Sequence, residues 1–195
     1  RMCKANLSLA IALTIASSVV PYVMAEYPVV SAVKGETLNL GKVQGTLFGI
    51  DADNKSTINA DYVSGRLMDG RKTIITSQNG STVNIKNGGY LGGANTTVQV
   101  LGGQVNLGEN AVLGMNQLQT KALSDYYSAK GDSIRNHVPA SKLQISGGSV
   151  AMADAAATGS ICAPYGQIQI SGNDTSIKAA NISADYGTVE IREAK

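Results

Sequence analysis

The most informative pattern of the chain lies between residues 81 and 114, where short apolar-polar-apolar triplets alternate with Gly and Asn. The triplets begin at Val83, Val98 and Val105, and the pattern predicts a further strand from Val112. Residues two apart point to the same face of a strand, so each triplet predicts a short strand with one buried side. The intervening Gly and Asn supply the positive φ values that sharp corners need. Strands this short suit a coil that winds around one axis and stacks on its neighbours, which predicts a parallel β-solenoid.

The same pattern extends over most of the chain. Segments starting at Val98, Leu143 and Ile168 share one form, namely apolar, polar, apolar, any residue, Gly, then Gly or Asn, and residues 83–88 are a looser copy. Further strands are expected at residues 37–40, 46–50, 56–59, 62–63, 72–76, 176–178, 181–183 and 188–191. Inward residues should stack in ladders along the axis, and Asn should bond to its counterpart one coil away.

These observations predict an all-β fold, a parallel β-solenoid of the right-handed β-helix type over residues 36–195, preceded by a lead-in at residues 26–35 that pairs as an edge strand. The alternative is a β-sandwich with short strands and Gly-rich turns, although a sandwich favours longer alternating runs than these.

The regular pattern stops near residues 115–137, where the spacing becomes helical. The apolar positions of this stretch recur three or four residues apart; they are Met115, Leu118, Ala122 and Leu123, with Tyr126 and Tyr127 on an adjoining face. Gly131 stands where a helix C-terminus favours glycine. The stretch therefore predicts a short helical insertion that leaves one corner of the solenoid.

Residues 1–25 have the organisation of a signal peptide. Arg1 and Lys4 precede an uncharged apolar run at residues 7–20, and Ala25 is a small residue at the expected cleavage position. The run is shorter than the ~20 residues that span a bilayer, so cleavage after Ala25 is expected in preference to an uncleaved membrane anchor. The chain is then exported through the inner membrane and does not itself span a membrane.

The composition bears on two questions, whether the chain binds nucleic acid and whether it contains a disulfide bond. Every acidic residue follows the leader, and removing Arg1 and Lys4 leaves as many basic as acidic residues, which argues against nucleic acid as a partner. All 22 Gly also follow the leader, a large share for a chain that must turn often. Cys162 is the one cysteine left after cleavage, so the cleaved chain is expected to have no intramolecular disulfide.

A calcium loop is suggested by Asp51 and Asp53, because carboxylates at alternate positions converge on a hard cation. The match then fails, since Lys55 and Ser56 stand where such a loop needs a ligand and a glycine. We expect a solvated corner loop here and assign no metal and no cofactor.

A serine nucleophile is suggested by Asp132 and Ser133, with His137, the only histidine, four residues further on in an expected loop. A catalytic triad needs its base oriented by a third group, and nothing in the sequence marks one. No catalytic residue is assigned.

Carbohydrate cleavage by a β-helix needs paired carboxylates on one face. The acids in question are scattered singly along the chain: Asp61, Asp69, Asp154, Asp174 and Asp185. We therefore expect no enzymatic activity.

The leader, the scarcity of cysteine and the Gly- and Asn-punctuated coils together resemble the passenger regions of bacterial autotransporters and filamentous adhesins, over most of residues 36–195. The resemblance implies a bacterial surface protein, a stalk segment at the outer membrane that mediates adhesion to a host glycan or matrix protein and is exported by an outer-membrane translocator. Residues 189–195 show no membrane barrel, so the chain is expected to be a fragment of a longer protein or a small free-standing solenoid. The alternatives are a polysaccharide-degrading β-helix enzyme, lyase or hydrolase, and a periplasmic structural solenoid.

Overall fold

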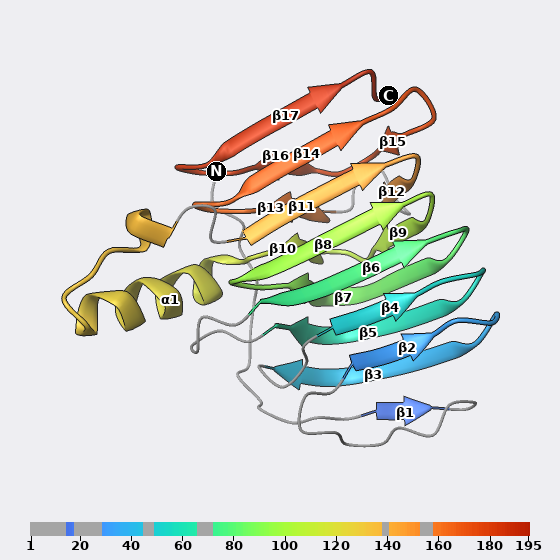
Figure 1. The fold of residues 1–195 in the computed structure, drawn as a ribbon, viewed down its shortest axis with the longest axis horizontal. Coiled ribbons are helices and arrows are strands. Elements are labelled where there is room, and N and C mark those ends of the chain that lie inside the picture. The colour runs from blue at the N-terminus through green and yellow to red at the C-terminus, as the bar shows by residue number, and fades with distance from the viewer. Residues whose placement is uncertain (1–14, 18–28, 45–48, 66–71, 138–140, 153–157) are drawn as a thin grey trace.

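The chain forms a stack of coils in which strands of consecutive coils pair in parallel (Figure 1). The computed structural model describes residues 15–17, 29–44, 49–65, 72–137, 141–152 and 158–195. Each strand pairs with the strand one coil away instead of with its neighbour in sequence. The predicted all-β parallel solenoid is therefore confirmed, and the β-sandwich alternative is wrong.

The first face of the solenoid is a seven-stranded parallel sheet that takes one strand from each coil. Its strands, in spatial order, are β2 (Val29–Ala32), β4 (Gly49–Ala52), β6 (Thr73–Gln78), β8 (Thr96–Leu101), β11 (Ser141–Ser146), β14 (Gln167–Ser171) and β17 (Thr188–Arg192).

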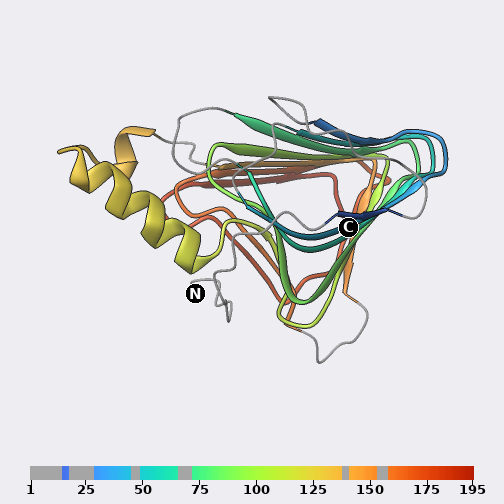
Figure 2. The same cartoon turned by 90° about the horizontal axis from the view of Figure 1, so that it is seen from below.

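The ten-stranded sheet bends to make the second and third faces, which gives the molecule a triangular outline when it is viewed along its axis (Figure 2). In the early coils one strand runs along both faces: β3 (Thr37–Gln44), β5 (Thr57–Ser64) and β7 (Thr82–Gly92). In the later coils the second face has β9 (Gln104–Leu107), β12 (Ser149–Met152) and β15 (Ser176–Ile177), and the third has β10 (Val112–Gly114), β13 (Ser160–Cys162) and β16 (Asn181–Ser183).

The predicted lead-in contains the first strand of the first face. β2 pairs in register with β4 at the edge of the seven-stranded sheet, which is the edge strand expected of this segment. The predicted leader, residues 1–25, lies outside the described residues except for β1 (Ile15–Ser17), which pairs antiparallel with β3. The predicted strand at 46–50 also falls largely outside them, and β4 begins at Gly49.

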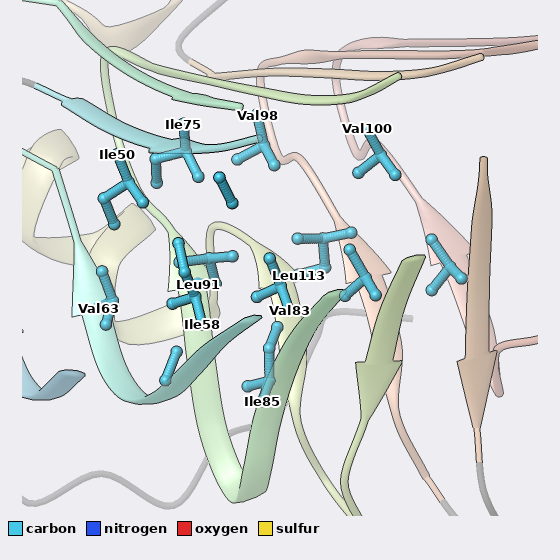
Figure 3. Packing of buried hydrophobic residues seen from close by; sticks show 14 of the residues in the cluster. Ile50, Ile58, Val63, Ile75, Val83, Ile85, Leu91, Val98, Val100 and Leu113 are labelled. Atoms are coloured by element: carbon cyan, nitrogen blue, oxygen red, sulfur yellow. The ribbon is translucent and has the colours of Figure 1, made fainter. Parts of the chain in front are cut away.

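The core is a set of apolar ladders that run along the axis (Figure 3). On the first face Ile50 pairs with Ile75, and Ile75 with Val98, each no more than 3 % exposed. The ladder continues through Leu143 and Ile168. Burying an aliphatic side chain of this size contributes about 1.5–3 kcal/mol, so stacked coils stabilise one another chiefly through these ladders.

The repeated form seen in the sequence corresponds to stacked strands in its three close copies. Val98, Leu143 and Ile168 occupy the same position in consecutive coils, as predicted. The looser copy at residues 83–88 is wrong, because Val83 pairs with Val105 on the second face, and the true counterpart of Val98 is Ile75. Gly and Asn occur at more than one corner of the triangle. The motif alone therefore does not show to which face a strand belongs.

The helical insertion leaves the corner between the third and first faces (Figure 2). It contains α1 (Gln117–Ala129) and the 3₁₀ helix η1 (Ile134–His137), which agrees with the prediction near residues 115–137. The helix ends with Lys130 as its C-cap, and Gly131 follows in the left-handed region with a φ of +71°. His137 belongs to η1 and not to a loop, which corrects the sequence-based expectation. Within the described part of the chain, neither helix has the length and apolarity needed to cross a membrane.

An asparagine ladder runs along the outside of the second face. Asn59 Nδ2 donates to Asn39 Oδ1 at 2.7 Å, Asn84 Nδ2 donates to Asn59 Oδ1 at 2.9 Å, and Asn106 Nδ2 donates to Asn84 Oδ1 at 2.8 Å. These residues are register partners in consecutive coils. The next partner along the same line is Ala151, so the ladder ends there.

We predict that Asn84→Ala destabilises the solenoid more than Asn39→Ala. Asn84 takes part in two ladder bonds and Asn39 in one, and a hydrogen bond of this kind contributes about 0.5–1.5 kcal/mol net. Chemical denaturation should therefore show a loss of roughly 1–3 kcal/mol for Asn84→Ala and about half of that for Asn39→Ala. Equal losses in the two variants would contradict the assignment of this stability to the ladder bonds.

Candidate functional site

The insertion is packed onto the solenoid by an apolar cluster of its own. Met115, Leu123, Tyr127 and Ile134 meet Ala94 of the preceding coil, and all of them are buried. Leu123 and Tyr127 lie one helical turn apart, so a single face of α1 covers the corner. The insertion therefore has a fixed position on the solenoid.

A capping box fixes the start of α1. Asn116 Oδ1 accepts from the backbone N–H of Gln119 at 2.9 Å, and Gln119 Oε1 accepts from the backbone N–H of Asn116 at 3.0 Å. Both side chains are buried, at 0 % and 6 % exposure. The box satisfies two N–H groups that a helix start leaves unpaired, which explains why an Asn with Gln three residues later begins the helix here.

Asp132 organises the second half of the insertion. Its Oδ1 accepts from the backbone N–H of Ser133 and from Asn136 Nδ2, both at 2.7 Å, and its Oδ2 lies 2.7 Å from His137 Nε2. The bond with His137, then the bonds with Asn136 and Ser133, lower the pKa of Asp132 to about 2. The ionised carboxylate thus holds the turn and η1 together at neutral pH.

The imidazole of His137 is held from a second side by Tyr127. The two rings stack at 3.9 Å between centroids with an interplanar angle of 6°. Burial, followed by the charge of Tyr126, raises the pKa of the Tyr127 hydroxyl, so this group stays protonated. His137 is therefore fixed in orientation by a ring on its face and a carboxylate on its edge.

Two further tyrosines extend this aromatic surface along the corner. Tyr165 and Tyr186 occupy equivalent turns of consecutive coils with φ of +56° and +58°, and their rings stack at 4.9 Å. The guanidinium of Arg135 lies 4.9 Å from the centre of the Tyr186 ring, and Tyr186 is 68 % exposed. We call the surface formed by Arg135, His137, Tyr165 and Tyr186 the aromatic ledge.

A short repeat in the sequence predicts the two tyrosines of the ledge, although the strand pattern alone does not. Ala-x-Tyr-Gly occurs at residues 163–166 and again at 184–187, directly before β14 and β17. Such a repeat places the two tyrosines one above the other in a solenoid. The contribution of Arg135 and His137 was not predictable in this way, because it depends on how the insertion folds back.

The residues considered for a calcium loop have other roles. Asp53 Oδ1 accepts a bond from Asn79 Nδ2 at 2.7 Å, which ties the corners of adjacent coils together. Asp51 lies on β4 with its Oδ1 buried. Among the described residues, no group of three or more His, Cys, Asp or Glu side chains is placed to hold a metal ion.

The residues considered for a serine nucleophile are brought together only in part. His137 and Asp132 do form a pair, which the sequence did not predict. Ser133 Oγ, however, accepts from the backbone N–H of Arg135 at 3.3 Å, which is the geometry of a turn cap. The contacts of all three residues thus build the turn before η1.

The candidate acids for carbohydrate cleavage lie in separate parts of the coil. Asp61 is on β5 and pairs with Lys86 at 3.4 Å, Asp174 is in the turn before β15, and Asp185 is in the turn before β17. Asp69 and Asp154 lie outside the described residues.

Cys162 is fully buried on β13 and is disulfide-bonded, and no cysteine of the described part is free. The chain's other cysteine, Cys3, belongs to the predicted leader and lies outside the described residues. The expectation of a chain without a disulfide concerns the cleaved form, and for that form it stays a prediction.

Comparison with protein families, curated proteins and solved structures finds no match to this chain. Its function is therefore inferred from the geometry of the ledge and the solenoid that carries it.

We predict that His137→Ala raises the pKa of Asp132 from about 2 toward its ordinary value of 3.8, because the variant removes the largest cause of the shift. Since the folded-state pKa is depressed, the stability that Asp132 contributes is complete above about pH 3.8 and is lost as the pH falls toward 2. In the variant the contribution should be smaller and its loss complete at a higher pH, because the folded-state pKa lies closer to 3.8. NMR titration of the side-chain carboxyl measures the pKa in the folded protein, and chemical denaturation at several pH values measures the stability. Arg135→Ala, which leaves the three bonds to Asp132 in place, is the control. An unchanged titration in His137→Ala would refute the assignment.

Proposed function

We propose that this chain is an exported bacterial surface protein, a right-handed β-solenoid stalk segment that carries an adhesive contact surface on its aromatic ledge. The partner is a host matrix protein or glycan, and an outer-membrane translocator delivers the chain to the surface. Right-handedness is supported by the strong general preference for right-handed crossovers between parallel strands.

The observation that carries this proposal is the composition of the ledge. Tyr and Arg are the residues most enriched among the energetic centres of protein interfaces, because large rigid rings bury area at a low cost in conformational entropy. Tyr186 is 68 % exposed although it is stacked on one side by Tyr165 and flanked by Arg135. An exposed ring held in a fixed orientation is suited to contact with a partner.

The solenoid supports the proposal as a stiff carrier. Solenoids present extended surfaces built from stacked coils, and here the outer positions are bonded from coil to coil. On the first face Gln99 Nε2 donates to Gln144 Oε1 at 3.3 Å, and the asparagine ladder does the same on the second face. Polar outer ladders of this kind suit a stalk better than they suit an enclosed catalytic pocket.

The alternative of a polysaccharide-degrading enzyme is supported less well, because the described candidate acids Asp61, Asp174 and Asp185 lie on different strands and turns. A lyase or hydrolase needs its carboxylates to converge on one bond. A periplasmic structural solenoid would have the same stack of coils, but that role does not require an exposed aromatic ledge.

The ledge is tested by Arg135→Ser and Tyr186→Ser in a solid-phase binding assay with immobilised fibronectin and collagen. Each variant should weaken binding by about tenfold, the loss expected for an interface residue that contributes somewhat more than 1 kcal/mol. Arg192→Ser is the matched control, because Arg192 is an exposed arginine on β17 that pairs with Glu190 and does not belong to the ledge. If Arg192→Ser weakened binding as much as Arg135→Ser, the loss would reflect the net charge of the protein and would contradict the proposal.

Export is tested independently of adhesion. A bacterial culture that expresses the chain should yield an exported form beginning at Glu26, because Ala25 is the small residue before the expected cut. N-terminal sequencing of the exported form measures this directly. Replacement of Ala25 by a bulky residue should leave the precursor uncut, and an exported form that still began upstream of residue 25 would refute the leader assignment.

A further inference from the structure

A second feature lies at the base of the insertion, on the outer side of the first face. A groove of about 250 Å³ opens there among residues from four successive coils. It is lined by Lys72, just before β6, by Asn95 and Thr97 at the start of β8, by Ser141 and Lys142 of β11, and by Gln167 of β14. None of these residues belongs to the aromatic ledge.

The register of the sheet explains why these side chains meet. Thr97, Lys142 and Gln167 are partners in consecutive coils, so they form one outward-facing column. Neighbouring strands lie about 4.8 Å apart, so a hydroxyl, an ammonium and an amide recur at that spacing. The column presents hydrogen-bonding groups in a line along the axis of the solenoid.

The charge of the groove is positive. Among the described residues its lining contains two ammonium groups, Lys72 and Lys142, and no carboxylate. Neither lysine takes part in an ion pair between described residues. An anion in the groove would accept charge-assisted hydrogen bonds from these two ammonium groups, which have no carboxylate partner among the described residues.

The alternation of β11 decides which of its side chains face the groove. Lys142 lies between the buried residues Ser141 and Leu143, so it points outward while Ser141 points to the interior. The groove therefore presents the outward column of Thr97, Lys142 and Gln167.

The size and lining of the groove restrict the ligand. Pockets for drug-sized molecules occupy roughly 300–1,000 Å³, so this groove suits a smaller unit. No aromatic ring of the described residues lines it, which disfavours a nucleobase, whereas hydroxyl and amide groups suit a polyol. Beyond the column lies a second one, formed by Gln99, Gln144 and Gln169, along which a longer chain can continue.

We infer that this groove binds one acidic sugar unit, carboxylated or sulfated, of a longer polysaccharide that follows the first face. The choice of a glycan as ligand rests on the proposed surface function, whereas the site itself rests on the groove. Lys142 and Lys72 bind the acidic group, and Thr97 with Gln167 binds its oxygens or those of a neighbouring hydroxyl.

The experiment is calorimetric titration of the whole chain with three tetrasaccharides at low salt. Hyaluronan carries carboxylate alone, chondroitin sulfate carries carboxylate and sulfate, and N-acetylchitotetraose is neutral. Binding of either acidic tetrasaccharide but not of the neutral one supports the site, and the comparison of the two tells which acidic group is preferred. Binding of the neutral tetrasaccharide with equal affinity, or of none of the three, would overturn the inference.

Variants then locate the binding. Lys142→Gln should lower the affinity by about tenfold, the loss of one charge-assisted hydrogen bond. Lys178→Gln, which removes an exposed lysine between β15 and β16, should leave the affinity unchanged. Equal losses in the two variants would mean general charge attraction and would refute the site.

Thr97→Val separates binding from folding. Because Thr97 lies in the outward column and valine keeps its shape, removal of the hydroxyl should lower the affinity severalfold without lowering the melting temperature. A lowered melting temperature with unchanged affinity would show a structural role instead. Arg135→Ser should keep the acidic-sugar affinity, and Lys142→Gln should keep matrix-protein binding, so failure of the ledge and failure of the groove are told apart.

Discussion

The fold depends on one constraint, which is that each coil must lie in register on the coil before it at the spacing of paired strands. Every inward side chain then meets its register partner in the next coil, as Ile75 meets Val98 and Val98 meets Leu143. The last coil shows how much this contact buries. Val189 and Ile191 pair with the inward-facing Ile168 and Ile170, yet they are 44 % and 53 % exposed, whereas their partners are almost completely buried.

The same constraint governs the backbone at the corners. At Gly114 a Cβ atom would stand 1.9 Å from the carbonyl oxygen of Cys162 in the next coil, and the φ of +115° also disfavours a side chain. Only glycine permits that approach. Where adjacent coils come this close, a connection between strands has to be short or has to leave the stack. The insertion leaves the stack directly after Gly114 and Met115, with Asn116 as the N-cap of α1.

The departure of the chain at this corner creates both surfaces considered for function. On the outer side, the insertion folds back so that Arg135 lies over Tyr186. At its base, Ser141 resumes the first face in register with Thr96 and places Lys142 beside Thr97. A regular coil would have neither the ledge nor the edge of the groove, because both need residues from the insertion or from its point of return.

The sequence by itself determined the periodic features. Alternation predicted the strands, Gly and Asn predicted the corners, and helical spacing with Gly131 predicted α1, because each of these is set by neighbouring residues. The tertiary structure alone decided which strands stack. It moved the partner of Val98 from residues 83–88 to Ile75. It also joined Asp132 to His137, stacked His137 on Tyr127, and gathered Lys72 and Lys142 into one groove. These contacts join residues whose proximity depends on the length of each coil and the path of the insertion, and neither quantity is encoded in local periodicity.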